Sequence, residues 1–481
     1  MRGTVASMGA GEQPTRVERL VFGFGLALVL GGCPKTSPTP ASDGASPTAR
    51  ATPQPKVEVE SEVESGPALE SDWTRDVLAT DLEVDIAGLW ARATIEFAPS
   101  SSTAASLEIG DLEILAVHDA EGRKLRFADR GDTLDLELPA STSPVRVEID
   151  YHFAWHPDQH GAMAPGSTLT WPNYCGNLFP CKSDPADGLR LSLSLSGVDD
   201  LLLAVYPKTI PADAPAYQLA WAIGDYQRLE LGKTRAGTKV TVWYLPESEF
   251  AAEDGTASLL AAFDWLEQTY GAYRFGDQVG SVEAPALGRY AGMEHHPFWH
   301  VDTGAMDNAE VHVHEAVHGW FGAGVRIACW QDLVLSEGTT TYLTARAIEA
   351  AAGPDVAAEL WAEYRERLAR DRGTIARPPG CGDIDVLGFF NGQIYVKGVF
   401  FYRALEQRIG RAALDRALAD VYARYQGQAL GMQELFRAIE ASSGYDPEPC
   451  AIPWLYTAQL PADIDAPCPA DSGEARADSD G

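Results

Sequence analysis

Basic residues are scarce in this sequence: 37 Lys and Arg stand against 69 Asp and Glu, and the net charge over 481 residues is −32. A chain this acidic repels nucleic acid and anionic lipid surfaces, so we exclude both as partners. The apolar run near the N-terminus, "LVFGFGLALVLGGC", is too short to span a bilayer comfortably, and no internal repeat is present. Histidine is also rare, yet six of the ten histidines lie between His295 and His318.

The seven cysteines include no Cys-x-x-Cys pair, so we do not expect a zinc site built from cysteine. Cys33 stands alone near the N-terminus. The other six are an even number in a chain that we expect to be exported, which favours disulfides. Proximity in the sequence suggests the pairs Cys175–Cys181 and Cys450–Cys468, which leaves Cys329–Cys381. Other pairings remain open at this point.

The N-terminal segment has the pattern of an export signal. Arg16 and Arg19 precede the apolar run "LVFGFGLALVLGGC", which is shorter than a membrane span and ends at Cys33. This ending resembles a bacterial lipoprotein signal, in which the chain is cut before the cysteine and a lipid is attached to its sulfur. An ordinary secretory signal and a short membrane anchor are the alternatives. The resemblance implies a lipid-anchored protein of the cell envelope, and Pro34 favours the outer membrane or periplasmic face.

Composition and periodicity divide the chain into five segments. Residues 34–56 are rich in Pro, Thr, Ser and Ala and cannot build a core. Stretches such as "SPVRVEIDYHF" alternate apolar and polar residues, which predicts strands, whereas "QIYVKGVFFYRALEQRIG" has helical spacing and ends at glycine. We therefore predict an α+β chain with a signal peptide (1–32), a disordered tether (33–72), an all-β domain (73–247), a mostly helical domain with a small mixed sheet (248–461) and a disordered acidic tail (462–481).

The sequence "HEAVH" at residues 314–318 fits the pattern His-Glu-x-x-His. Residues four apart share one face of a helix, so His314 and His318 can reach one metal ion, and Glu315 beside them can act as a general base. A catalytic zinc site needs a third protein ligand. Glu337, nineteen residues after His318 and at the start of the next predicted helix, can supply it. Two imidazoles and one carboxylate predict one Zn²⁺ per chain.

The remaining histidines are expected to have other roles. His312 is two residues from His314 and faces about 200° away from it on a helix, so we predict a core residue or one that supports the ligands. The three histidines of "GMEHHPFWH" (292–300) are expected to line the cleft or to be structural, because three ligands are already found. His156 and His160, in the polar loop "WHPDQHG", are expected to lie at the surface.

The stretch "HEAVHGWFG…WQDLVLSEGTTTYL" resembles the aminopeptidase N family of gluzincin zinc peptidases. "YAGMEHHP" (290–297) is similar to the family's Gly-x-Met-Glu-Asn exopeptidase motif, and "IYVKGVFF" (394–401) is similar to its Tyr-x-Lys-Gly stretch. "PWLYTAQLP" (453–461) resembles its Trp-Leu-Tyr signature, and "LFPCKSDPADG" (178–188) its Phe-Pro-Cys segment. The resemblance implies a saddle-like β domain followed by a thermolysin-like catalytic domain.

The resemblance also implies roles for matching residues. The zinc ligands would be the two histidines and the glutamate already named, and Glu315 would be general base and proton shuttle. Tyr395 would donate a hydrogen bond to the oxyanion of the tetrahedral intermediate. Glu294 would bind the free α-amine of a peptide substrate, within a substrate-binding stretch that includes Gly292 and Met293. The chain would then be a zinc-dependent aminopeptidase that removes N-terminal residues from peptides.

Two departures from the family pattern bear on the amine site. His295 stands where the family has asparagine, and Trp171 stands ten residues before Cys181, where a second amine-binding Glu or Gln is usual. The chain also ends soon after the catalytic segment, so we expect a more open cleft. A zinc endopeptidase or another zinc hydrolase, and a non-catalytic peptide-binding lipoprotein, are therefore alternatives. The sequence does not predict the oligomeric state or the side-chain preference.

Overall fold

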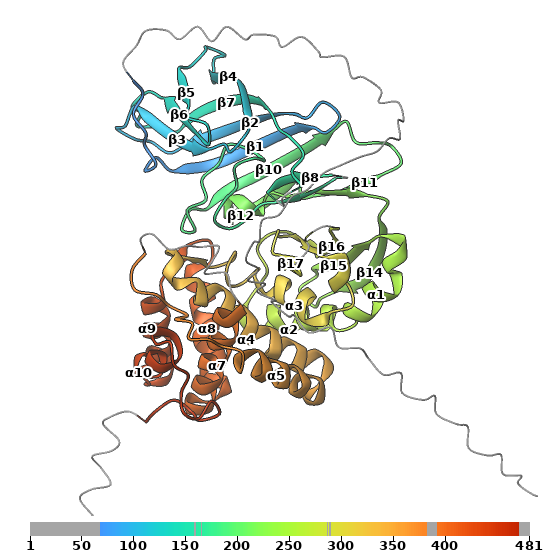
Figure 1. Cartoon of the computed structure of the whole chain (residues 1–481), viewed down its shortest axis with the longest axis vertical. Helices are drawn as coiled ribbons and strands as arrows, with labels where there is room; N and C mark the ends of the chain where they lie inside the picture. Colours follow the sequence, from blue (N-terminus) through green and yellow to red (C-terminus); the bar gives the residue numbers. More distant parts are fainter. Residues whose placement is uncertain are drawn as a thin grey trace, which may run out of the picture. The chain divides into compact units, whose positions relative to one another are not determined.

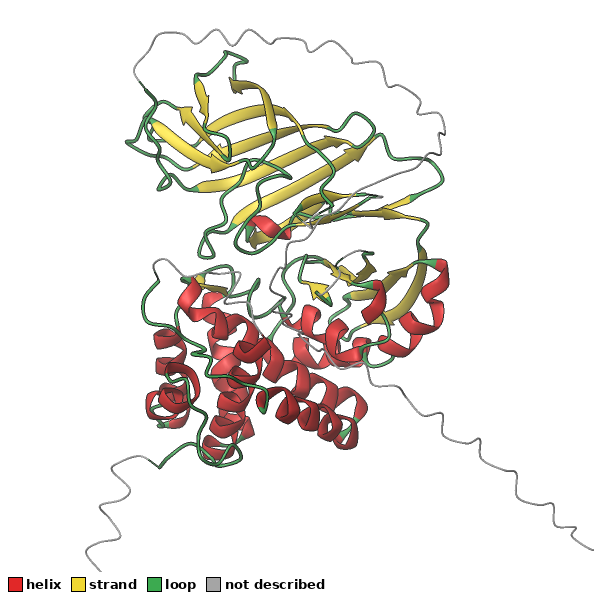
Figure 2. Ribbon diagram, viewed as in Figure 1, coloured by secondary structure: helices red, strands yellow, loops and turns green. Residues whose placement is uncertain are grey.

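The computed structural model describes residues 68–157, 160–164, 166–285, 287, 290–381 and 392–470. Strands predominate up to Tyr244 and helices from Glu249 onward (Figure 2), which confirms the predicted α+β class. None of the helices in these ranges is both long and apolar enough to pass through a membrane. The expected signal peptide, with Cys33, and most of the expected tether lie outside the described residues and stay predictions.

A six-stranded sheet is the main layer of the N-terminal region, in the order β12-β10-β1-β2-β7-β4 (Figure 1). Its strands are β1 Val77–Asp85, β2 Trp90–Phe97, β4 Glu113–Asp119, β7 Val145–His152, β10 Leu189–Ser196 and β12 Thr209–Ala214. Neighbours are antiparallel except β1 and β10. In β7 the side chains of Val147, Ile149 and Tyr151 are buried and those between them are partly exposed. This alternation is what one core-facing side of a sheet requires.

Smaller sheets complete this region. A three-stranded antiparallel sheet and two strand pairs contain β3 Ala104–Glu108, β5 Phe127–Asp129, β6 Thr133–Glu137, β8 Gly161–Met163, β9 Ser167–Leu169, β11 Leu203–Val205 and β13 Ala222–Gly224. The 3₁₀ turn η1 (Ala216–Gln218) lies between β12 and β13. Its side chains are buried, although the turn has only three residues.

A five-stranded mixed sheet follows, in the order β14-β15-β16-β18-β17. Its strands are β14 Gln227–Lys233, β15 Lys239–Tyr244, β16 Gln278–Glu283, β17 Gly292–Met293 and β18 Phe298–Val301. The first two precede residue 247, where the sequence suggested that the β domain ends. Because β15 pairs with β16, a boundary at residue 247 divides this sheet, whereas a boundary just after Gly224 leaves every sheet whole.

The longer helices agree with the predicted ones to within a turn at most ends, whereas the short helices α1 and α10 were not predicted. They are α1 Glu249–Gly255, α2 Leu259–Tyr270, α3 Ala309–Val317, α4 Leu333–Ala352, α5 Pro354–Leu368, α7 Gly392–Ile409, α8 Arg411–Tyr425, α9 Met432–Ser443 and α10 Glu448–Ala451. Two bounds differ from expectation. The α3 helix stops at Val317 and does not continue to residue 322, and α4 begins at Leu333, so Glu337 lies one turn inside it.

Helices α4 and α7 cross at a pair of glycines. A Cβ added to Gly338 would lie 2.8 Å from the Cα of Gly398, so neither position accepts a larger residue without moving the helices apart. Gly338 follows Glu337 directly, and Gly398 comes three residues after Tyr395. The close crossing therefore brings both functional candidates to one place. The neighbouring Thr341 donates its hydroxyl to the Glu337 carbonyl oxygen at 2.7 Å, which satisfies a polar group inside this buried helix.

Among the described residues, three disulfides hold the second half of the fold and one loop of the first. They are Cys175–Cys181, Cys329–Cys381 and Cys450–Cys468, which confirms the pairing suggested by proximity. The last pair corrects the expected disordered tail. Cys468 is buried and its backbone N–H donates to the Ala404 carbonyl oxygen at 3.1 Å, so the chain stays packed beyond residue 461. Residues 471–481 lie outside the described part of the chain.

Candidate functional site

His314 of α3 and His318, which caps the C-terminal end of this helix, face the same space. Asn308 caps the helix, because its side chain accepts a hydrogen bond from the Glu310 backbone N–H at 3.0 Å. His314 and His318 follow one turn apart, and their Nε2 atoms lie 3.3 Å from each other. The Nδ1 of His318 lies 3.1 Å from the Phe321 carbonyl oxygen. A proton on Nδ1 donates to that oxygen, which leaves the lone pair of Nε2 for a metal ion.

Glu337 joins the two histidines from α4. Its Oε2 lies 3.3 Å from the Nε2 of His314 and 3.5 Å from the Nε2 of His318. A tetrahedral zinc ion with bonds of roughly 2.0–2.1 Å holds its ligand atoms about 3.3–3.4 Å apart. The three predicted ligands therefore have the mutual spacing of a zinc shell that leaves a fourth position open. The donor set, two imidazoles and a carboxylate, also fits zinc.

The charges around this cluster favour a bound cation. Burial alone would lower the pKa of His318, but the carboxylates of Glu337 and Glu294 outweigh burial and raise it to about 10. Burial would raise the pKa of Glu337, but the neighbouring imidazoles outweigh it and lower the pKa to about 2. Three buried carboxylates, including Glu315, thus surround two imidazoles. A divalent cation in place of the His318 proton would balance more of this negative charge in a poorly solvated space.

Glu315 comes from the same helix as the histidines and is only 7% exposed. One of its carboxylate oxygens lies within 4.8 Å of a ring nitrogen of His318. Burial raises the pKa of Glu315 well above its usual range. Gly292 of β17 packs against it so closely that a Cβ there would collide with the Oε1 of Glu315. The glycine lets the strand pass beside a carboxylate whose raised pKa suits a proton acceptor.

Tyr395 reaches the cluster from α7. Its ring centroid lies 5.9 Å from that of His314. Burial, and then the charge of Glu337, raise the pKa of the phenol well above its usual value, so the phenol keeps its proton and can donate a hydrogen bond. Lys397, two residues further on, is buried and donates to backbone carbonyls of two loops beside α7. It fixes these loops and takes no part in the metal cluster.

Glu294 follows the edge strand β17 and is buried beside Glu315 and His318. The phenol of Tyr217 donates a hydrogen bond of 2.8 Å to the Oε1 of Glu294. Met293 is buried as well and belongs to one apolar cluster with Tyr217. The structure thus brings the predicted amine-binding glutamate to the predicted zinc ligands. It adds Tyr217, for which no motif in the sequence offers a signal.

The other histidines near the centre belong to the core, in agreement with the predicted structural roles. The Nδ1 of His312 lies 2.7 Å from the Ser281 hydroxyl and its Nε2 lies 2.9 Å from the Met306 carbonyl oxygen, so both ring nitrogens have partners. The Nδ1 atoms of His295 and His300 lie 3.3 Å apart. Burial lowers the pKa of His295 well below its usual value and that of His300 to about 4.

The buried His300 predicts a loss of stability in acid. Its pKa is about 4 in the folded protein, against 6.5 for a solvated histidine. The unfolded chain therefore takes up the proton first, so the contribution to stability is complete above about pH 6.5 and is lost as the pH falls through about 4. We expect the free energy of unfolding to fall by about 2 kcal/mol from this group between about pH 6.5 and about pH 4.5.

Urea unfolding at the two pH values measures this loss. His300→Gln should make the pH dependence shallower, because the titrating ring is removed. His118→Gln, on the partly exposed strand β4, is the matched control and should keep the dependence of the unsubstituted protein. An equal slope in all three proteins would contradict the assignment to His300.

Two other sequence expectations concern the β region. Trp171 is buried, and its ring lies 4.3 Å from that of Tyr290 in an edge contact. It stands where the aminopeptidase N family usually has its second amine-binding residue. His156 and His160 were expected at the surface but are partly buried. The Nε2 of His156 lies 3.2 Å from a carboxylate oxygen of Asp111, and the ring of His160 packs 6.0 Å from that of Trp171. Packing of this polar loop against distant residues is not visible in its own sequence.

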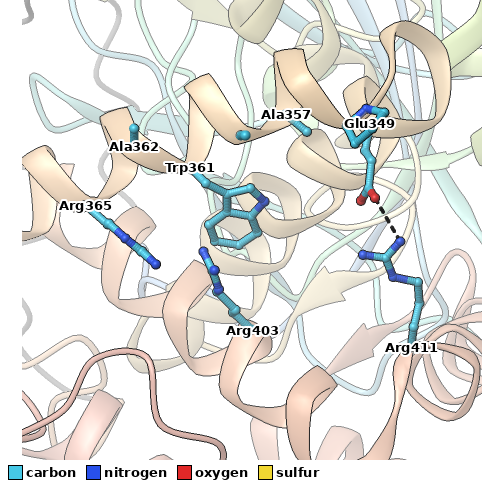
Figure 3. A pocket seen from close by; sticks show the side chains of 9 residues that line it. Glu349, Ala357, Trp361, Ala362, Arg365, Arg403 and Arg411 are labelled. Carbon is cyan, nitrogen blue, oxygen red and sulfur yellow. Dashed lines mark hydrogen bonds and ion pairs between the residues drawn. The ribbon is translucent and has the colours of Figure 1, made fainter.

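A separate pocket lies between α5 and α7 (Figure 3). The guanidinium of Arg403 lies 4.4 Å from the centre of the Trp361 ring, and Arg411 bonds to Glu349 at 3.1 Å. Arg365 at the other end of the pocket pairs with an aspartate of the C-terminal segment. No residue that lines this pocket belongs to the histidine and glutamate cluster, so we assign it no catalytic role.

Comparisons with known proteins agree with this geometry. Residues 295–454 match the model of the peptidase family M1 domain. The chain is 25% identical over 374 residues to leucine aminopeptidase 2 of Ajellomyces capsulatus, a match that covers 68% of this chain and 58% of that protein. It is 30% identical over 156 residues to aminopeptidase N of Streptomyces lividans, covering 31% of this chain and 18% of that protein. The chain thus spans less than two thirds of the length of these relatives.

Solved structures share the fold over most of the chain. Aminopeptidase A of Legionella pneumophila, in complex with aspartic acid, has a TM-score of 0.71 at 17% identity, covering 80% of this chain and 50% of that one. An M1 zinc metallopeptidase from Deinococcus radiodurans has a TM-score of 0.68 at 18% identity, covering 82% of this chain and 96% of that one. A mutant of the latter was solved with a Tyr-Ser-Ala substrate. At these identities the likeness is one of fold.

Proposed function

We propose that this chain, which carries a peptidase family M1 domain at residues 295–454, is a zinc-dependent aminopeptidase that removes N-terminal residues from peptides. One observation carries the proposal. The metal-ligand triad and the carboxylates of Glu294 and Glu315 lie in a single buried cluster, although they come from α3, α4 and the end of β17. Such a convergence of titratable groups is typical of an active site.

His314, His318 and Glu337 would hold the zinc ion. When bound, it supplies a Lewis acid that polarises a carbonyl oxygen and lowers the pKa of water. The protein's part is to fix the geometry. The Nδ1 proton of His318 bonds to the Phe321 carbonyl oxygen, which orients the ring, and the crossing of α4 with α7 fixes the position of the carboxylate ligand.

Proton transfer falls to Glu315. Its buried carboxylate accepts a proton from the attacking water and later passes it to the amine of the leaving peptide. Tyr395 donates its phenol proton in a hydrogen bond to the oxygen that becomes negatively charged in the transition state. Glu315 comes from α3 and Tyr395 from α7, so the two groups can act on opposite sides of a substrate carbonyl bound beside the ligand cluster.

Glu294 determines which peptide bond is cut. Its carboxylate pairs with the free α-ammonium of the substrate in a charge-assisted hydrogen bond. Because this carboxylate lies within 4.8 Å of atoms of Glu315 and His318, an ammonium bound to it would bring the first peptide bond close to both residues. An acetylated N-terminus has no positive charge and should lose this interaction.

Free and N-acetylated forms of one peptide test the proposal. Zinc-loaded protein is expected to cleave the free peptide at its first bond, with a kcat/KM at least roughly a hundredfold above that for the acetylated form, because the acetylated form forms no ion pair with the buried Glu294 carboxylate. Mass spectrometry of the products identifies the bond. Cleavage of both forms at internal bonds would contradict the aminopeptidase proposal and would indicate an endopeptidase.

That endopeptidase is the second candidate, and Trp171 is the observation that favours it. The side chain at this position is apolar and packs against Tyr290, so it contributes no charge to an amine site. Absence of any cleavage by protein with zinc bound would favour a peptide-binding protein. Lipid attachment at Cys33 and a place in the cell envelope stay predictions from the sequence.

A further inference from the structure

Tyr217 belongs to the β region, yet its side chain reaches the predicted amine site. It lies on the turn η1, 77 residues before Glu294, and its phenol donates a 2.8 Å hydrogen bond to the Oε1 of that residue. The side chain is 7% exposed, so water does not compete freely for this bond. A neutral phenol that donates to a buried carboxylate fixes the direction of one carboxylate oxygen and leaves the other available.

Further hydrogen bonds fix the turn that carries Tyr217. The Oε1 of Gln218 accepts a 2.6 Å hydrogen bond from the backbone N–H of His296. The hydroxyl of Thr170 donates at 2.8 Å to the carbonyl oxygen of Tyr217. The turn is therefore attached on one side to the "GMEHHP" stretch and on the other to the strand pair of the β region. Its phenol has little freedom to move away from Glu294.

The Glu294 carboxylate has competing attractions. One of its oxygens lies within 4.8 Å of an oxygen of Glu315 and of a ring nitrogen of His318. The nearby ring nitrogen of His318 is an alternative partner for this carboxylate, whereas an amine anchor must face the substrate. The bond from Tyr217 opposes rotation toward the ligands. Position 171 supplies no carboxylate to bind the substrate amine, because it is a tryptophan that packs against Tyr290.

We propose that Tyr217 is a positioning residue for the substrate amine: it holds the Glu294 carboxylate so that its second oxygen receives the α-ammonium. The inference rests on the proposed aminopeptidase function and assigns to the β region a direct part in recognising the N-terminus. Removal of the hydroxyl should weaken binding of a free N-terminus and leave binding of an acetylated one unchanged, because only the former uses Glu294.

Tyr217→Phe tests this role. The KM for a leucine-initiated tripeptide should rise roughly tenfold with kcat changed much less, as expected for one hydrogen bond to a charged group that acts in binding. Calorimetric titration in a zinc-loaded Glu315→Gln background gives a second readout without turnover. There the Kd of the free tripeptide should rise roughly tenfold, and that of its N-acetyl form should stay the same.

Two further variants separate positioning from a general effect on the fold. Tyr151→Phe removes another buried phenol hydroxyl of the β region, which donates to the Leu178 carbonyl oxygen at 3.0 Å, and should leave both Kd values unchanged. In a Glu294→Gln background, Tyr217→Phe should cause no further loss of affinity for the free tripeptide.

Each outcome decides one statement. If the unsubstituted protein binds the free tripeptide more tightly than the acetylated one, and Tyr217→Phe leaves the Kd of the free tripeptide unchanged, Tyr217 does not position Glu294. In that case the proposed aminopeptidase function is retained. Equal weakening of the free and acetylated ligands, or an additive loss with Glu294→Gln, also overturns the positioning role. If the unsubstituted protein binds the free and the acetylated tripeptide equally, Glu294 does not bind the substrate amine. That result would contradict both the proposed aminopeptidase function and the role of Tyr217.

Discussion

Replacing Glu315 by glutamine is expected to lower kcat for peptide cleavage by roughly a hundredfold to ten-thousandfold while zinc stays bound. Glutamine keeps the size of the side chain but cannot accept a proton from water. The metal ligands are other residues, 3.3 to 3.5 Å apart among themselves, so their arrangement does not depend on the charge of Glu315. Steady-state kinetics measures kcat, and metal analysis of the purified variant measures the zinc content.

Glu310→Gln is the matched control for this change. Glu310 lies on the same helix, one turn before His314, and accepts hydrogen bonds of 2.8 and 2.6 Å from Arg367. Its loss removes a partly exposed ion pair, which contributes on the order of 1 kcal/mol or less to stability, and should leave kcat unchanged. If Glu315→Gln retained the activity of this control with zinc bound, Glu315 could not be the general base.

Tyr395→Phe should give the second largest effect. Loss of one hydrogen-bond donor to the developing oxyanion costs roughly a hundredfold to a thousandfold in kcat, with a smaller change in KM, because the bond forms in the transition state. The ring itself stays in place, since it packs 5.9 Å from that of His314 and lies between buried residues of α7. Zinc content and the thermal unfolding midpoint should therefore match those of the unsubstituted protein.

Tyr402→Phe provides the comparison for this variant. Tyr402 lies two turns further along α7, is buried, and shares a 2.6 Å hydrogen bond with the Thr339 hydroxyl. Its replacement also removes one buried hydroxyl from the same helix and should cost about 1 kcal/mol of stability, without a hundredfold effect on kcat. Equal losses of kcat in the two variants would indicate that α7 had shifted and that Tyr395 is not an oxyanion donor.

Much of the secondary structure could be predicted because burial of one face of a strand or helix makes apolar residues recur at a regular spacing along the sequence. The alternation in β7 and the spacing of Met432, Leu435, Phe436 and Ile439 in α9 are both visible without any partner. The pairing of β15 with β16 was not predicted, because 33 residues with two helices of their own separate these strands in the chain. The packing of Cys468 was missed for a similar reason: a small, acidic segment is held by a partner outside it.

The sequence by itself determined the metal chemistry. Residues four apart on a helix must face the same way, so His314, Glu315 and His318 are linked by local geometry alone, and a glutamate from the next helix completes the set. Tertiary structure decided what surrounds the amine-binding glutamate. Tyr217 lies 77 residues before Glu294, and Trp171 lies further still. Such contacts depend on how the β region packs against the edge strand β17, and no short-range pattern in the chain records that packing.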